Sequence, residues 1–257
     1  RKLQQDPQIG YDKDLRQMSK FFGVPEDTVI KCNISLYSNK FMCDGMAAGG
    51  GFFINYALSD KGKACVANSV VPERKLSTPL HESTHYLFHQ SPMYKIFKHE
   101  ADRVMEGKKP LYPGIHRVIS TMKDYFEQNP EAKRYGNVND NLSGAILSGF
   151  DEALAASASA LQDEKKCRIT DPNYNVLQDK NREWYHGFEG ANKLAPAVFP
   201  LFKSYLAEGK PIDNSFFMKL ADNMQEFQKT RNNSRNNSAG NLSQTAIIAN
   251  KQNRQPR

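Results

Sequence analysis

The sequence has few cysteines and no long apolar run. No two of its four cysteines form a Cys-x-x-Cys pair, which argues against a cysteine-rich zinc finger and against a disulfide-dense scaffold. No apolar stretch approaches the roughly 20 residues that a membrane-spanning helix needs, so we expect no integral membrane protein. Hydrophobic residues nevertheless make up 39% of the 257 residues and aromatic residues 11%. This content is too high for a wholly disordered chain.

Acidic residues are missing from the C-terminal end of the chain. The chain has 35 Lys and Arg against 28 Asp and Glu, a net charge of +7, and five of the basic residues lie in residues 230–257. This segment is rich in Asn, Ser and Gln, so we expect a disordered basic tail after a body that spans residues 1–229. The tail lacks aromatic residues that would stack on bases, and we expect no nucleic-acid partner.

The periodicity of apolar residues predicts a small sheet followed by helices. Alternation at 30–36, an apolar run at Phe52–Leu58 and a return at Ala64–Val71 indicate a mostly antiparallel sheet within residues 28–71. Helices are predicted at Asp12–Phe22, Leu80–His89, 92–106, Ile115–Glu127, Ser143–Gln162, Val176–Phe188, Ala197–Leu206 and Ser215–Lys229. We therefore expect an α+β fold in which a functional cleft lies between the small sheet and a mainly helical body.

The strongest chemical signal is the pentapeptide His81-Glu82-Ser83-Thr84-His85. Residues i and i+4 share one face of a helix, so both imidazoles can reach a single metal ion. Imidazole nitrogen suits Zn²⁺, and Glu82 would then lie beside the metal-bound water as a general base. Chance matches to this HExxH pattern number roughly 0.007 in a chain of this composition. The alternative is a pair of structural histidines with a surface glutamate between them.

Such a zinc site needs a third protein ligand. His89 follows His85 by four residues, but ligands at i, i+4 and i+8 span about 12 Å of helix, which is too long for one ion. We expect His89 to support the site or to pack in the core. Glu152 is the better ligand, because a carboxylate among small and apolar residues is costly unless a partner neutralises it. The alternative interpretation of Glu152 is an acid near a helix N-terminus, where the helix dipole favours a negative charge.

These residues resemble the zincin metallopeptidases, and among them the gluzincin branch. In that branch the third ligand is a Glu on a later helix, often in a Glu-Gly-Leu-Ala segment, and Glu152-Ala153-Leu154-Ala155 matches with Ala in place of Gly. The resemblance covers residues 52–165. The metzincin pattern HExxHxxGxxH fails at Phe88 and Ser91. Aspartate is the third ligand in another zincin branch, which leaves Asp151 as the alternative to Glu152.

The resemblance implies one Zn²⁺ per chain and an endopeptidase that hydrolyses peptide bonds of a protein substrate. It also implies an upstream strand that pairs with the substrate backbone, for which Ala64–Val71 is the candidate. A downstream Tyr or His would stabilise the oxyanion, and we expect Tyr185 or His186 in this role, although aromatic packing is equally compatible with them. Weaker candidates for the oxyanion role are Tyr135, His116 and His99.

A compact HExxH protein with a polar basic tail also resembles the secreted effector proteases of intracellular bacterial pathogens. This narrower resemblance implies delivery into the host cytosol and a host protein substrate such as actin. Unpaired cysteines would suit that reducing compartment. We expect a monomer. The competing hypothesis is a non-catalytic binding protein with a basic tail, in which the histidines or a zinc ion are structural.

Overall fold

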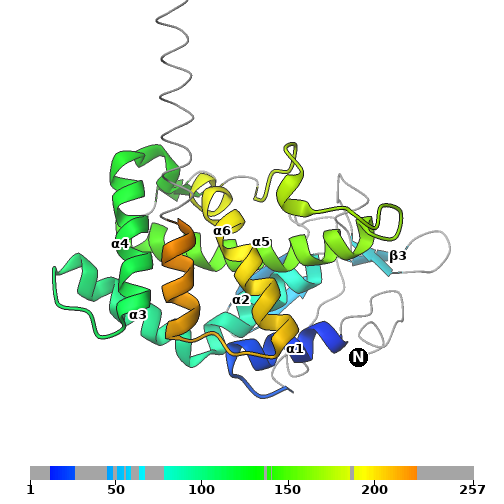
Figure 1. Cartoon of the computed structure of the whole chain (residues 1–257), viewed down its shortest axis with the longest axis horizontal. Coiled ribbons are helices and arrows are strands. Elements are labelled where there is room, and N and C mark those ends of the chain that lie inside the picture. Colours follow the sequence, from blue (N-terminus) through cyan, green and yellow to red (C-terminus); the bar gives the residue numbers. More distant parts are fainter. Residues whose placement is uncertain are drawn as a thin grey trace, which may run out of the picture.

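The fold was analysed in a computed structural model of the chain. The structure describes residues 12–26, 45–48, 51–54, 56–58, 64–66, 78–135, 138–139, 141–185 and 188–224. Helices dominate these residues (Figure 1). Their bounds are α1 Asp12–Phe22, α2 Thr78–Gln90, α3 Pro92–Met105, α4 Pro113–Gln128, α5 Leu142–Cys167 and α6 Glu189–Glu208, and residues 214–224 are helical as well. Short 3-10 helices lie at η2 Pro130–Lys133 and η3 Val176–Gln178.

Local sequence signals set several helix ends. The Ser91 side chain accepts a hydrogen bond from the Tyr94 backbone N–H, and Pro92 occupies the first turn of α3. This cap separates α3 from α2, which ends one residue earlier. The Asn141 side chain caps α5 by accepting from the Gly144 N–H at 2.7 Å. The two caps therefore set where α3 and α5 begin.

Helix α5 runs through the middle of the body (Figure 1) and packs against α6, α2, α3 and α4. Its inner surface is built from buried small residues, including Ala153, Ala156 and Ala160, so neighbouring helices approach it closely. Phenylalanine rings fill the space around it. The Phe97 and Phe150 rings, for example, stack with centroids 4.6 Å apart. This dense core holds α5 rigidly against its neighbours.

The strands within the described residues form three separate antiparallel pairs. These pairs are β1 Gly45–Ala48 with β2 Gly51–Ile54, β3 Tyr56–Leu58 with β4 Ala64–Val66, and β5 Arg134–Tyr135 with β6 Val138–Asn139. Of these strands, β1 and β2 make the most extensive contacts with α2. The predicted strand at 30–36 and much else of the predicted sheet within 28–71 lie outside the described residues. The mainly helical half of the predicted α+β fold is present in the described part of the chain.

Most predicted helices are found, with two corrections. Helix α1 has the predicted bounds, and α6 begins at Glu189, eight residues before the predicted Ala197. The predicted helix at Val176–Phe188 is wrong, because its described residues 176–185 contain only the short 3-10 turn η3. Residues 225–229 and the predicted tail at 230–257 lie outside the described residues. Among the helices that are described, none is long and apolar enough to cross a bilayer.

A candidate metal centre between two helices

The residues of the HExxH motif all lie on α2, as their spacing predicts, and His81 and His85 face α5. His89, near the end of α2, contacts Asp151, whereas His81, two turns earlier, contacts Ser159. Contacts that run forward along one helix and backward along the other show that α2 and α5 are antiparallel. His85 lies between His81 and His89 along α2 and faces both Asp151 and Glu152. Two rigid helices therefore position the whole site.

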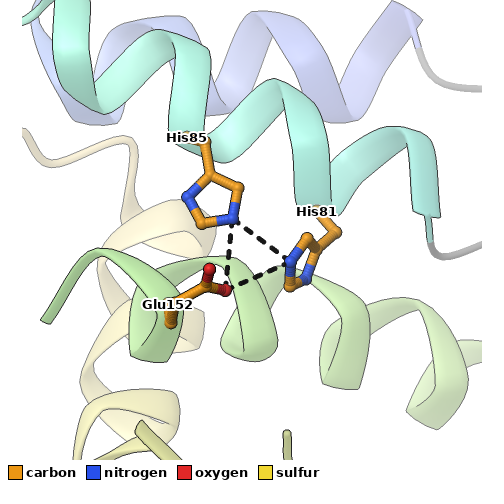
Figure 2. Close-up of side chains that lie close together, drawn as sticks. All are labelled: His81, His85 and Glu152. Carbon is orange, nitrogen blue, oxygen red and sulfur yellow. Dashed lines mark hydrogen bonds and ion pairs between the residues drawn. The ribbon is translucent and has the colours of Figure 1, made fainter. Parts of the chain in front are cut away.

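Three side chains converge on one point (Figure 2). The Nε2 atoms of His81 and His85 are 3.2 Å apart. Glu152 Oε2 lies 3.4 Å from His81 Nε2 and 3.3 Å from His85 Nε2. The three atoms form a nearly equilateral triangle.

The size of this triangle fits a tetrahedral zinc ion. Zinc bonds to imidazole nitrogen and carboxylate oxygen are about 2.0–2.2 Å long, so the donor atoms of a tetrahedral site lie about 3.3–3.6 Å apart. The edges of 3.3 and 3.4 Å fall at the short end of this range, and the edge of 3.2 Å lies just below it. Two imidazole nitrogens and one carboxylate oxygen are also a donor set typical of Zn²⁺. His81, His85 and Glu152 could therefore hold a metal ion.

Each imidazole also has a partner at its other ring nitrogen. Asp151 Oδ1 lies 2.9 Å from His85 Nδ1, and Ser159 Oγ lies 3.3 Å from His81 Nδ1. A ring that donates through Nδ1 keeps the lone pair of Nε2 free for a metal. The Asp151 carboxylate can only accept, so it favours the tautomer that a metal ligand needs at His85, and the Ser159 hydroxyl, which can donate or accept, is compatible with that tautomer at His81.

The two adjacent acids of α5 occupy different places. Glu152 belongs to the triangle, whereas Asp151 lies on the opposite edge of the His85 ring and does not join the group that could hold a metal. Asp151 also contacts His89, at 2.8 Å from its Nε2. The geometry therefore favours Glu152 over Asp151 as the third donor, and it places His89 beside Asp151 and not in the triangle.

The two buried carboxylates of the site favour a bound cation. Burial by itself would lower the pKa of His85, but the charges of Asp151 and Glu152 outweigh it and hold that pKa well above its ordinary value. Burial would raise the pKa of Glu152, but the charge of His85 and hydrogen bonds from both histidines hold it well below its ordinary value. A positively charged His85 would balance the two carboxylates, and a metal cation bound by the neutral ring would take over that role.

Glu82 is buried next to this cluster and is not part of the triangle. Burial raises the pKa of its carboxyl group, and the nearby charges of Glu152 and Asp151 act in the same direction. The charges of His81 and His85 oppose this rise without cancelling it. A carboxyl group with a raised pKa beside a metal site can accept a proton at neutral pH and release it again.

The predicted oxyanion residues have different positions. The Tyr185 ring stacks parallel to the His81 ring, with centroids 5.8 Å apart and planes inclined by 7°, so Tyr185 lies beside the site. His186 lies outside the described residues. His116 pairs with Glu100 of α3 at 2.7 Å, His99 is exposed on α3, and Tyr135 lies in β5.

Sequence reasoning did not single out Ser159. It lies seven residues after Glu152, which is two turns along α5 and therefore on the same face. That spacing was the available signal, but serines are common among the small residues of α5 and nothing distinguished this one. Only the antiparallel packing against α2 brings Ser159 to His81.

Comparisons with known proteins assign no family. No protein-family model, no curated protein and no solved structure matches this chain. Interpretation of the site therefore depends on its own geometry.

Proposed function

We propose that this chain is a zinc-dependent hydrolase that cleaves peptide bonds of a protein substrate. In this proposal His81, His85 and Glu152 bind the ion and Glu82 is the general base. The observation that carries the proposal is the triangle of donor atoms with edges of 3.2–3.4 Å, adjacent to a buried Glu82 on the same turn of α2.

The number of donors favours a catalytic over a purely structural ion. Structural zinc sites usually have four protein ligands, whereas catalytic sites have three and keep one position for water or substrate. Among the described residues, the group that could hold a metal has three members. The side chain of His81 is 16% exposed, against 10% for His85 and Glu152, which is consistent with access from the His81 side.

A bound zinc ion would lower the pKa of a water molecule to about 7 and polarise a carbonyl oxygen. Glu82 accepts a proton from the attacking water as its oxygen bonds to the carbonyl carbon of the substrate. When the carbon–nitrogen bond breaks, Glu82 returns this proton to the leaving amine. The raised pKa of Glu82 supports both steps, because the group must hold the proton between them.

Tyr185 is the proposed donor to the developing oxyanion. Its support is its position, since the ring lies against His81 at the edge of the site. A phenol in this position can donate to negative charge on a substrate oxygen.

The decisive experiment compares the wild-type chain with Glu82→Gln. We expect Glu82→Gln to lose at least about 100-fold in hydrolysis while it binds one zinc per chain, because the amide cannot accept the proton. Glu127→Gln, an exposed glutamate of α4, is the matched control and keeps both properties. Full hydrolysis by Glu82→Gln would overturn the mechanism.

Substrates are best found by comparing cleavage of whole proteomes by the wild-type chain and by Glu82→Gln. The resemblance to secreted effector proteases makes host cytosolic proteins, including actin, the first to test. Zinc binding with no cleavage of any protein would instead favour a structural zinc in a binding protein.

A further inference from the structure

Asp151 bridges two histidines of α2. Its Oδ1 lies 2.9 Å from His85 Nδ1, and its Oδ2 lies 2.8 Å from His89 Nε2. The residue is 9% exposed, and within the described part of the chain its ion pairs are both with these histidines. A buried carboxylate is stable only if its charge is paired, and here each oxygen lies against one histidine: His89 makes a hydrogen bond to Oδ2, and His85 forms an ion pair with Oδ1.

The two donors have different surroundings. The His85 side chain is 10% exposed and belongs to the triangle of donor atoms, whereas the His89 side chain is 47% exposed and lies one turn farther along α2. His89 is not a member of the group that could hold a metal. Its link to the metal site runs through Asp151.

His89 is itself held in place by α3. Its ring packs against the Tyr94 ring, with centroids 4.4 Å apart. Tyr94 lies in the first turn of α3, directly after the Ser91 cap that separates this helix from α2. The position of His89 is therefore set by the junction between the two helices.

We propose that His89 is a positioning residue of the metal centre: by donating to Asp151 Oδ2 it fixes the carboxylate that orients His85 with Nε2 toward the ion. This inference depends on the metal site of the proposed function. A carboxylate held at one oxygen only can rotate about its terminal bond, which misaligns Oδ1 with His85 Nδ1. Such outer partners of metal-binding histidines typically change metal affinity by about 10–100-fold.

The first experiment measures zinc affinity of the full chain by competition with a chromophoric chelator. We expect His89→Leu to bind zinc about tenfold more weakly, because Asp151 Oδ2 loses its donor. His89→Gln should stay within about threefold of the wild-type affinity, because the Gln amide nitrogen can donate from nearly the position of Nε2. The matched control is His99→Leu, at an exposed histidine of α3, which should bind as the wild type does.

The second experiment tests whether His89 acts through Asp151. In an Asp151→Ala background, His89→Leu should cause no further loss of zinc affinity, since the pathway is already broken. Thermal unfolding of each metal-free variant verifies that it is folded before zinc is added.

The outcomes separate this inference from the metal site itself. Unchanged zinc affinity in His89→Leu would overturn the role of His89 and leave the metal site intact. Equal losses of zinc affinity in His89→Leu and His89→Gln would overturn that role in the same way. Additive losses in the double variant would show that His89 does not act through Asp151. A wild-type chain that binds no zinc would overturn both the metal site and this inference.

Discussion

Adjacent acids on α5 differ in the histidine atoms that they contact. Consecutive residues of a helix point about 100° apart, so Asp151 and Glu152 reach opposite edges of the same imidazole. Glu152 meets His85 at Nε2, where an ion would bind, and Asp151 meets it at Nδ1. One acid is thus suited to bind the metal and the other to orient a ligand.

Replacing Glu152 with Gln should abolish tight zinc binding. A neutral amide oxygen is a poorer ligand than a carboxylate, and the negative charge that balances the ion is lost. We expect zinc affinity to fall by more than about 100-fold, beyond the usual effect of an outer partner. Chelator competition measures this change.

Glu164→Gln is the matched control for Glu152→Gln. Glu164 is buried on the same helix but pairs with Lys203 and Arg168, away from the triangle. This substitution should lower the free energy of unfolding by about 1–3 kcal/mol and leave zinc affinity unchanged. Equal zinc affinity in Glu152→Gln and Glu164→Gln would show that Glu152 is not a ligand.

At the scale of elements, close helix packing at Gly114 leaves no room for a side chain. A Cβ atom at Gly114 of α4 would lie 2.7 Å from backbone atoms of Asn214 and Met218. Backbone atoms cannot move aside as a side chain can. We expect Gly114→Ala to lower the free energy of unfolding by about 1–3 kcal/mol, as measured by urea denaturation.

Gly149→Ala provides the comparison. A Cβ atom at Gly149 of α5 would lie 3.3 Å from the flexible end of Met122 and 3.4 Å from the Phe126 ring. The gain in helix propensity, up to about 1 kcal/mol, offsets this tight contact. Gly149→Ala should therefore stay within about 1 kcal/mol of the wild type, and a larger loss than in Gly114→Ala would contradict this account.

The sequence predicted elements well where a periodic pattern agreed with its flanking residues. The apolar stripe of α1 and the spacing of His81 and His85 are of this kind. The segment at 176–188 also has apolar residues, but the Asp171, Asn175 and Asp179 side chains accept hydrogen bonds from backbone N–H groups two residues ahead. These local turns compete with a helix, and periodicity alone does not reveal them.

The choice between Asp151 and Glu152 could not be made from the sequence either. Both acids lie on the same helix, and the ring edge that each one meets depends on how α5 is rotated against α2. That rotation is set by side-chain packing across the core, such as the edge-to-face contact of Phe88 of α2 with Phe150 of α5. Packing of this kind depends on contacts between residues far apart in the chain.

For the whole molecule, zinc should act as a clamp between α2 and α5. A ligand that binds only the folded state at 100 times its Kd stabilises it by about 2.7 kcal/mol. For a domain of this size that corresponds to a rise in Tm of roughly 5–10 °C. Differential scanning calorimetry with and without zinc measures it, and EDTA should reverse it.

Two comparisons make the thermal experiment specific. Mg²⁺ prefers oxygen donors and should give no rise in Tm. Glu152→Gln should lose the response to zinc and still unfold cooperatively. An unchanged Tm for the wild type with saturating zinc would contradict a site that links these helices.

The bridging position of Asp151 has a consequence for how the sequence can vary. Asp151 pairs with His85 and with His89, so its two oxygens tie two positions of α2 to one position of α5. A related chain that has lost the acid at 151 has no reason to retain the histidine at 89, while His81, His85 and Glu152 can persist without either. Substitutions at 89 and 151 should therefore occur together among relatives, independently of the three residues that face the ion.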